Sequence, residues 1–168
     1  ANYALAVTEL YKVEYLLSQN EKNVDQITLL EIIAEAHFNL AEYENDVELL
    51  NHVLKLRNDM SITQGVARTY HLIANSYYQL QRYDDAYNAF WQSLQFAKQD
   101  ELVVRVALAE LGLGQVLYQQ QQYTQAKERL LNAQLVFTQY NLSPVKLSTQ
   151  ISLVKVMYAL NQRTQANK

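Results

Sequence analysis

The sequence repeats with a period of 40 residues. Aligning the chain with itself at this spacing gives one aromatic column, in which Arg163 takes the last place after Tyr3, Tyr43, Tyr83 and Tyr123. Four more columns share the period: Ala6, Asp46, Ala86, Ala126 and Ala166; Leu10, Leu50, Phe90 and Leu130; Ile33, Ile73, Leu113 and Leu153; Ala34, Ala74, Gly114 and Val154. Five columns at one spacing predict a tandem array of a single structural unit.

The clearest copy of the unit, residues 67–98, contains two helical patterns separated by a polar break at Gln81 and Arg82. In the first pattern, large and small apolar residues recur at three- and four-residue steps: Tyr70, Ile73, Ala74, Tyr77 and Leu80. The second pattern has a similar stripe: Ala86, Ala89, Phe90, Ser93, Leu94 and Ala97. Such spacing places each stripe on one face of a helix, so the unit is predicted to be an antiparallel helix hairpin.

The repeat also predicts where the units begin and end. We expect the second helix of a truncated unit in residues 1–20, full units at 21–60, 61–100 and 101–142, and the first helix of a further unit at 143–162. Tyr3 enters the array in mid-unit, so the sequence is interpreted as a fragment of a longer protein. Polar residues at the expected helix starts are predicted N-caps: Asp25, Asp84, Asp100, Thr124 and Ser143.

Two copies lie close to a known signature. Tetratricopeptide repeats share the spacing of Tyr70, Ile73, Ala74, Tyr77, Tyr83, Ala86, Phe90 and Ser93, and part of it recurs in Leu113, Gly114, Tyr123, Ala126, Leu130 and Ala133. The chain thus resembles the tetratricopeptide family, although its unit is longer than the usual 34 residues and lacks the usual closing proline. Long units of this kind resemble those of bacterial regulatory and sensor domains.

This resemblance implies an all-α fold, a right-handed α-solenoid of about eight helices stacked as antiparallel hairpins. It also implies a non-enzymatic protein- or peptide-binding module. In a larger bacterial signalling protein, such a module would be the input or scaffolding domain of an attached output, for example a diguanylate cyclase or a transcriptional regulator.

Charge and composition exclude several other functions. The net charge is −3 and the isoelectric point about 5.6, which gives no attraction to nucleic acid or to anionic lipid. Cysteine is absent, so thiolate catalysis and thiolate metal sites are excluded. No apolar run reaches transmembrane length and no signal-peptide pattern is seen. A cysteine-free chain suits the cytosol or the periplasm, and the cytosol is favoured.

Catalytic motifs are also lacking. The three histidines have no recognisable partner motif, and His37, in the column of Tyr77, Leu117 and Met157, is interpreted as a packed residue. No catalytic, cofactor or metal site is therefore predicted. A metal held by Glu31, Glu35 and His71 is the disfavoured alternative, because it lacks a further ligand.

In stacked hairpins the first helix of each unit lines the concave wall, where such arrays bind partners. The expected groove residues share the face opposite the hairpin contact: Glu31, Glu35, Phe38, His71, Asn75, Tyr78, Leu111, Gln115, Tyr118, Ile151, Lys155 and Tyr158. One column of these groove residues is aromatic in every unit: Phe38, Tyr78, Tyr118 and Tyr158. Such rings are typical of a recognition surface, and the alternative role of this column is packing between units. The acidic end at Glu31 and Glu35 favours a basic partner segment, unless it is simply a solvated face.

The rival hypothesis comes from a different functional class. A purely structural array could space other domains or form a homodimer, with its groove empty. Apolar residues at the two open ends would then mediate self-association: Leu10, Val13, Leu153 and Val154.

Overall fold

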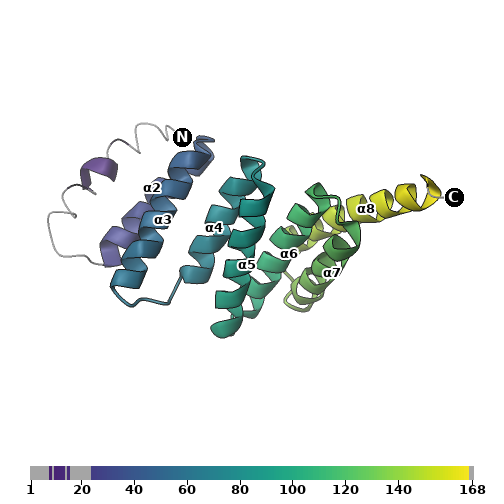
Figure 1. Cartoon of the computed structure of the whole chain (residues 1–168). Helices are drawn as coiled ribbons and strands as arrows, with labels where there is room; N and C mark the ends of the chain where they lie inside the picture. The colour runs from purple at the N-terminus through teal and green to yellow at the C-terminus, as the bar shows by residue number, and fades with distance from the viewer. Residues whose placement is uncertain (1–7, 9, 14, 16–23, 167–168) are drawn as a thin grey trace. The chain divides into compact units, whose positions relative to one another are not determined.

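A computed structural model describes residue 8, residues 10–13, residue 15 and residues 24–166 (Figure 1). Within these residues the only regular elements are helices, as the all-α prediction requires. The helices are α2 (Val24–Asn39), α3 (Tyr43–Asp59), α4 (Val66–Gln79), α5 (Tyr83–Gln99), α6 (Val103–Gln119), α7 (Tyr123–Gln139) and α8 (Ser143–Ala166). Most of the helix predicted in residues 1–20 lies outside the described residues.

The helices form two compact parts, each larger than one repeat. We call residues 1–82 unit 1 and residues 83–168 unit 2. In unit 1, α3 packs against both α2 and α4. In unit 2, α6 packs between α5 and α7, and α8 packs on α7 and also touches α6. Helices adjacent in sequence are therefore packed as hairpins within each unit. The assignment of the whole chain to one array stays a prediction.

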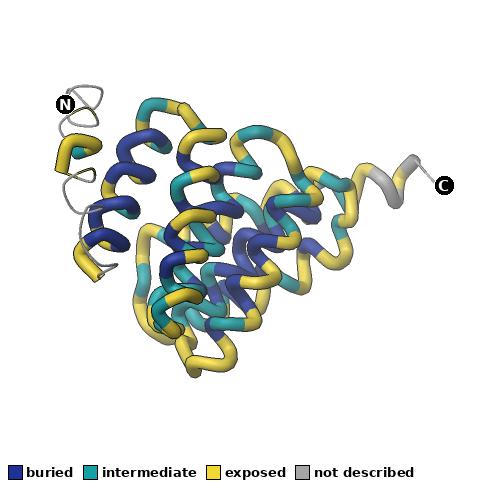
Figure 2. Tube along the Cα trace, turned by 60° about the vertical axis from the view of Figure 1, so that its left-hand side comes forward, coloured by how far each residue is buried: buried dark blue, intermediate teal, exposed yellow. Residues whose placement is uncertain are grey.

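The repeat columns occupy equivalent places in both units. Tyr43, Tyr83 and Tyr123 are the first residues of α3, α5 and α7, and all three are half-buried. Seven residues, or about two helical turns, after each tyrosine lies a fully buried large residue: Leu50, Phe90 and Leu130. Figure 2 shows buried stretches recurring along the helices of each unit. The 40-residue period therefore reflects one packing scheme used repeatedly.

The loops between helices share one backbone conformation. A residue with φ between 54° and 61° recurs every 20 residues: Ala41, Ser61, Gln81, Glu101, Gln121 and Asn141. After each one, the next N–H bonds a carbonyl five residues earlier, as from Glu42 to His37 at 2.9 Å and from Gln122 to Leu117 at 2.8 Å. This bond closes a Schellman motif, which ends a helix by main-chain hydrogen bonds.

These turns explain why the N-cap predictions at Asp84, Asp100, Thr124 and Ser143 are wrong. After five of the six left-handed residues, the next helix begins only two residues later. Ser143 is consequently already helical, and Asp84 and Thr124 are second residues of their helices, while Asp100 lies before the left-handed residue Glu101. Observed N-caps such as Leu102 and Gln122 make no side-chain capping bond. Asp25 lies in the first turn of α2.

Two further boundaries differ from expectation. Gly65 has φ 87° and is the N-cap of α4, so this helix begins at Val66, later than the unit start expected at residue 61. At the other end, α8 continues to Ala166, past the helix end expected at residue 162. Of the predicted open-end residues, Leu153 is buried, whereas Val13 and Val154 are 47% and 67% exposed and Leu10 is half-buried.

Replacing Gln121 with glycine is expected to stabilise the protein by about 1 kcal/mol, because a left-handed backbone strains any residue that has a Cβ atom. Gln121 is exposed, so little packing is lost. Urea unfolding monitored by circular dichroism measures the change. Gln125→Gly is the matched control: Gln125 is exposed inside α7, where glycine should destabilise by about 1 kcal/mol. Equal effects of the two changes would contradict this account of the turn.

Candidate functional site

Unit 1 buries polar side chains at positions that are apolar in unit 2. Glu31 and Arg57 align with the residues two repeat periods later in the sequence, Leu111 and Phe137. Both of these belong to the apolar core of unit 2. In the same alignment, the buried residues Asp46 and Ser76 correspond to buried alanine and valine at positions 126 and 156. His37 likewise takes the place of a buried leucine. We refer to these residues as the polar core of unit 1: Glu31, His37, Asp46, Arg57 and Ser76.

Glu31 connects α2, α3 and α4 in unit 1. Its Oε1 accepts a hydrogen bond from Arg57 Nη2 at 3.0 Å, and its Oε2 accepts one from Arg68 Nη1 at 2.8 Å. The side chains of Glu31 and Arg57 are only 12% and 11% exposed, so this ion pair is largely shielded from water. Because both carboxylate oxygens are engaged, Glu31 does not form the free acidic end that was expected, and that part of the groove prediction is wrong.

His37 is held from two sides. Its Nδ1 lies 2.5 Å from Glu42 Oε2, and its Nε2 lies 3.1 Å from the hydroxyl of Tyr11. With a proton on Nδ1, the ring donates to the carboxylate and accepts from the tyrosine. The side chain is buried, which confirms the interpretation of His37 as a packed histidine.

Asp46 is the most deeply buried carboxylate of the polar core. The residue is 2% exposed, and its Oδ2 accepts a hydrogen bond from the hydroxyl of Ser76. Burial raises the pKa of Asp46 from 3.8 to about 6, while the Ser76 hydrogen bond and the nearby His37 act in the opposite direction. The ionised form is thus disfavoured by its surroundings, because one neutral donor replaces several water molecules.

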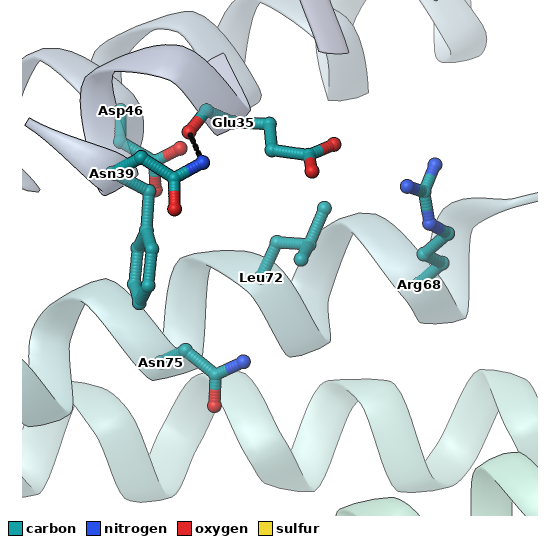
Figure 3. Close-up of a pocket in the computed structure, with 7 residues that line it drawn as sticks. Glu35, Asn39, Asp46, Arg68, Leu72 and Asn75 are labelled. Carbon is teal, nitrogen blue, oxygen red and sulfur yellow. Dashed lines mark hydrogen bonds between the residues drawn. The ribbon is translucent and has the colours of Figure 1, made fainter. Parts of the chain in front are cut away.

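A cavity of about 270 Å³ lies beside Asp46, between α2, α3 and α4 (Figure 3). Its lining combines apolar, amide and charged side chains: Glu35, Phe38, Asn39, Asp46, Arg68, Leu72 and Asn75. In Figure 3 the Glu35 carboxylate points toward Arg68, and Leu72 reaches from α4 toward α2. Asn39 Nδ2 is fixed by a 2.8 Å bond to the carbonyl of Glu35. The cavity brings together three of the predicted groove residues, Glu35, Phe38 and Asn75.

The remaining groove residues have different environments. His71 and Tyr78 are half-buried on α4. In unit 2, Leu111 is 7% exposed and belongs to the apolar core, so its assignment to a binding surface is wrong. Gln115 is half-buried and donates to Ser152 Oγ at 3.5 Å. Lys155 and Tyr158 are exposed on α8.

The aromatic column is divided between packing and exposure. The ring of Phe38 packs edge-on against Tyr43 at a centroid distance of 5.3 Å, and Tyr118 packs against Tyr123 at 5.7 Å. Both pairs lie within one hairpin and help to fix the start of its second helix. Tyr158, by contrast, is 66% exposed. Phe38 and Tyr118 therefore pack within a hairpin rather than between units, and Phe38 also lines the cavity.

Sequence reasoning missed six residues of the polar core and the cavity: Asn39, Asp46, Arg57, Arg68, Leu72 and Ser76. Asp46 carried a signal, since it is the one acidic residue in an otherwise alanine column. The two arginines reach the site from other helices, and their partnership with Glu31 could not be recognised from one helical face.

The described residues contain no group of three or more His, Asp or Glu side chains placed to hold a metal ion. The alternative of a metal at Glu31, Glu35 and His71 also conflicts with the two arginines that occupy Glu31. None of the helices in the described part of the chain is both long and apolar enough to cross a membrane.

Comparison with solved structures relates the fold to known proteins. Apo RapI superposes with a TM-score of 0.86 over 99% of this chain, at 17% identity, and this chain covers 60% of it. A Rap protein complexed with competence and sporulation factor gives 0.79 over 98% of this chain, at 17% identity, with 46% of its own length covered. A putative kinesin light chain from Podosopora anserina, described as having nearly identical TPR-like repeats, gives 0.75 over 98%, at 18% identity and with 82% covered. The fold is tetratricopeptide-like.

The tetratricopeptide-like fold agrees with the signature residues found in the sequence. No protein-family model matches the chain, and no curated protein matches it. The chain spans less than two thirds of the length of either Rap structure.

Proposed function

We propose that this chain is a non-enzymatic module that binds a protein or peptide segment, and that the unit 1 cavity is part of its binding surface. The observation that carries the proposal is the cavity itself, which combines Glu35, Phe38 and Asn75. These residues lie on α2 and α4, each of which is the first helix of a repeat. A concave site with apolar walls and a few polar groups is typical of ligand sites. A tetratricopeptide-like relative solved with competence and sporulation factor supports a binding role.

The same proposal extends to the protein context. We infer an input or scaffolding domain of a larger bacterial signalling protein, whose output could be a diguanylate cyclase or a transcriptional regulator. Support comes from the Rap structures and from aspartyl phosphate phosphatase F of Bacillus subtilis. That phosphatase superposes on this chain with a TM-score of 0.83 at 16% identity, and this chain covers 43% of its length.

Peptide selection tests the binding role. Peptides selected from a random display library on the wild-type chain should lose affinity at least about tenfold for Phe38→Ala and Asn75→Ala, because truncating a central contact commonly costs more than 1 kcal/mol. Fluorescence anisotropy of labelled peptides measures the affinities. Asn132→Ala, an exposed asparagine on α7, is the matched control and should bind normally. Failure to select any binder, or wild-type affinity in both cavity variants, would refute the proposal.

A second candidate, a structural or oligomerisation array, is favoured by the exposed face of α8. Leu147, Ile151, Val154 and Tyr158 are 60%, 50%, 67% and 66% exposed and follow one another at helical spacing. One period earlier, three of the corresponding α6 residues are buried. If α8 mediates a homodimer, Ile151→Asp should abolish concentration-dependent sedimentation, whereas Asn75→Ala should leave it unchanged. Monomeric wild-type chain at all concentrations would eliminate this candidate.

A further inference from the structure

We propose that the unit 1 cavity is a site for an alkylammonium group, as on a lysine side chain or a free peptide amino terminus, with Asp46 as its counter-ion. The inference builds on the proposed function, since it names the chemical group by which a partner segment would be held. It applies to Asp46 and its neighbours in unit 1, and needs nothing from unit 2.

The first argument is that the fold does not require the Asp46–Ser76 pair. The corresponding residues of unit 2, Ala126 and Val156, are fully buried in the apolar core. Alanine and valine thus suffice at these positions in a helix arrangement built by the same repeat. A carboxylate in this place is costly to bury, and departures of this kind from an otherwise consistent pattern are typical of functional positions.

The second argument is the charge around the cavity. Asp46 and Glu35 contribute two carboxylates from α3 and α2. Among the described lining residues, the one cation is Arg68 on α4, whose Nη1 already lies 2.8 Å from Glu31 Oε2. The lining therefore carries two carboxylates against one guanidinium that is shared with Glu31, and this balance of charge favours a cation over an anion. Burial strengthens this preference, because charges attract more strongly where water is excluded.

The third argument distinguishes an ammonium from a guanidinium. A guanidinium pairs best with two parallel hydrogen bonds to both carboxylate oxygens. Asp46 Oδ2 already accepts from Ser76, which favours a compact donor at Oδ1. An ammonium has three donors, and the side-chain oxygen of Asn39 in the lining is a suitable further acceptor. Phe38 and Leu72 supply apolar surface for a methylene chain.

NMR titration of the 168-residue chain with small probes tests the proposal. n-Butylammonium should shift the side-chain amide signals of Asn39 and Asn75, and n-butanol and n-butyrate should not. Asp46→Asn should weaken n-butylammonium binding roughly ten- to hundredfold, as expected for a lost charge-assisted hydrogen bond. Glu48→Gln is the matched control, because Glu48 is an exposed carboxylate on the same helix that does not line this cavity.

A second variant keeps the test valid if Asp46→Asn disturbs folding. Asp46→Ala combined with Ser76→Val installs the apolar pair that unit 2 already packs, and it should also abolish binding. Unchanged n-butylammonium affinity in either folded variant overturns the proposal. So does tighter binding of n-butyrate or of n-butylguanidinium to the wild-type chain.

Two peptides identify the source of the ammonium group. N-acetyl-Gly-Lys-Gly-amide offers only the side-chain amine, and Gly-Gln-Gly-amide offers only the terminal amine; Asp46-dependent binding of either one supports the proposal. Selected peptides whose affinity depends on Phe38 and Asn75 but not on Asp46 would overturn this inference and leave the binding role intact. Asp46-dependent n-butylammonium binding without any selectable peptide would support this inference and refute the peptide-binding role.

Discussion

Replacing Glu31 with alanine is expected to destabilise unit 1 by about 3–5 kcal/mol, because removing one member of a buried ion pair leaves the other charge without compensation. Arg57 is the group at risk, since its side chain is 11% exposed. Arg68 is 41% exposed and can return to water at little cost. Hydrogen exchange of the α2 and α3 amides should show protection reduced by a factor of roughly 10² to 10³.

The repeat itself supplies the control for this change. The double variant Glu31→Leu, Arg57→Phe reproduces the Leu111 and Phe137 pair of unit 2, and replacing both members of a buried pair by packed apolar residues is often nearly neutral. It should retain much more protection than Glu31→Ala. If the single variant exchanges at the wild-type rate, or if the double variant is the less stable of the two, the ion pair does not hold unit 1 together as described.

Asp46→Asn is expected to stabilise the protein by up to about 3 kcal/mol above pH 7 and to have little effect near pH 4. The pKa of Asp46 is about 6 in the folded chain against an ordinary value of 3.8, and each pKa unit corresponds to about 1.4 kcal/mol. Because the folded state holds the proton more tightly, the contribution of Asp46 is favourable below pH 3.8 and is lost as pH rises through about 6.

Urea unfolding of both proteins between pH 4 and pH 8 gives the necessary comparison. The difference in unfolding free energy should grow with pH over this range and then remain constant. Glu48→Gln, which removes an exposed carboxylate from the same helix, should show no such growth. A difference that stays level, or that grows as the pH falls, would mean that burial does not raise the pKa of Asp46.

Much of the fold could be predicted because one packing requirement is repeated. A tyrosine that begins a helix, a small residue three positions later and a large buried residue after it recur in α3, α5 and α7, and Asp46 alone departs from the small-residue column. The helix starts could not be predicted from capping residues. Main-chain bonds of the Schellman turns fix them, and those bonds are compatible with alanine, serine, glutamine, glutamate or asparagine.

The site was predicted less completely than the fold. Helical spacing grouped Glu35 and Phe38, which lie one turn apart on α2 and both line the cavity. It failed for Glu31, because the arginines that neutralise it are 26 and 37 residues away in sequence. It failed for Leu111, because a face pointing away from one helix neighbour can be covered by another. Periodicity describes one helix at a time, whereas a site depends on several.

Five of the six left-handed residues are followed by a helix that begins two residues later, so these five joints share one length and one main-chain geometry, without dependence on particular side chains. A gene segment that encodes the stretch between two equivalent joints can therefore be copied or deleted without shifting the phase of the downstream helices. One hairpin can carry acidic and basic residues while an equivalent hairpin keeps an apolar interior, as unit 1 and unit 2 do. Adding a hairpin to the scaffold and changing the interior of one hairpin are therefore independent changes.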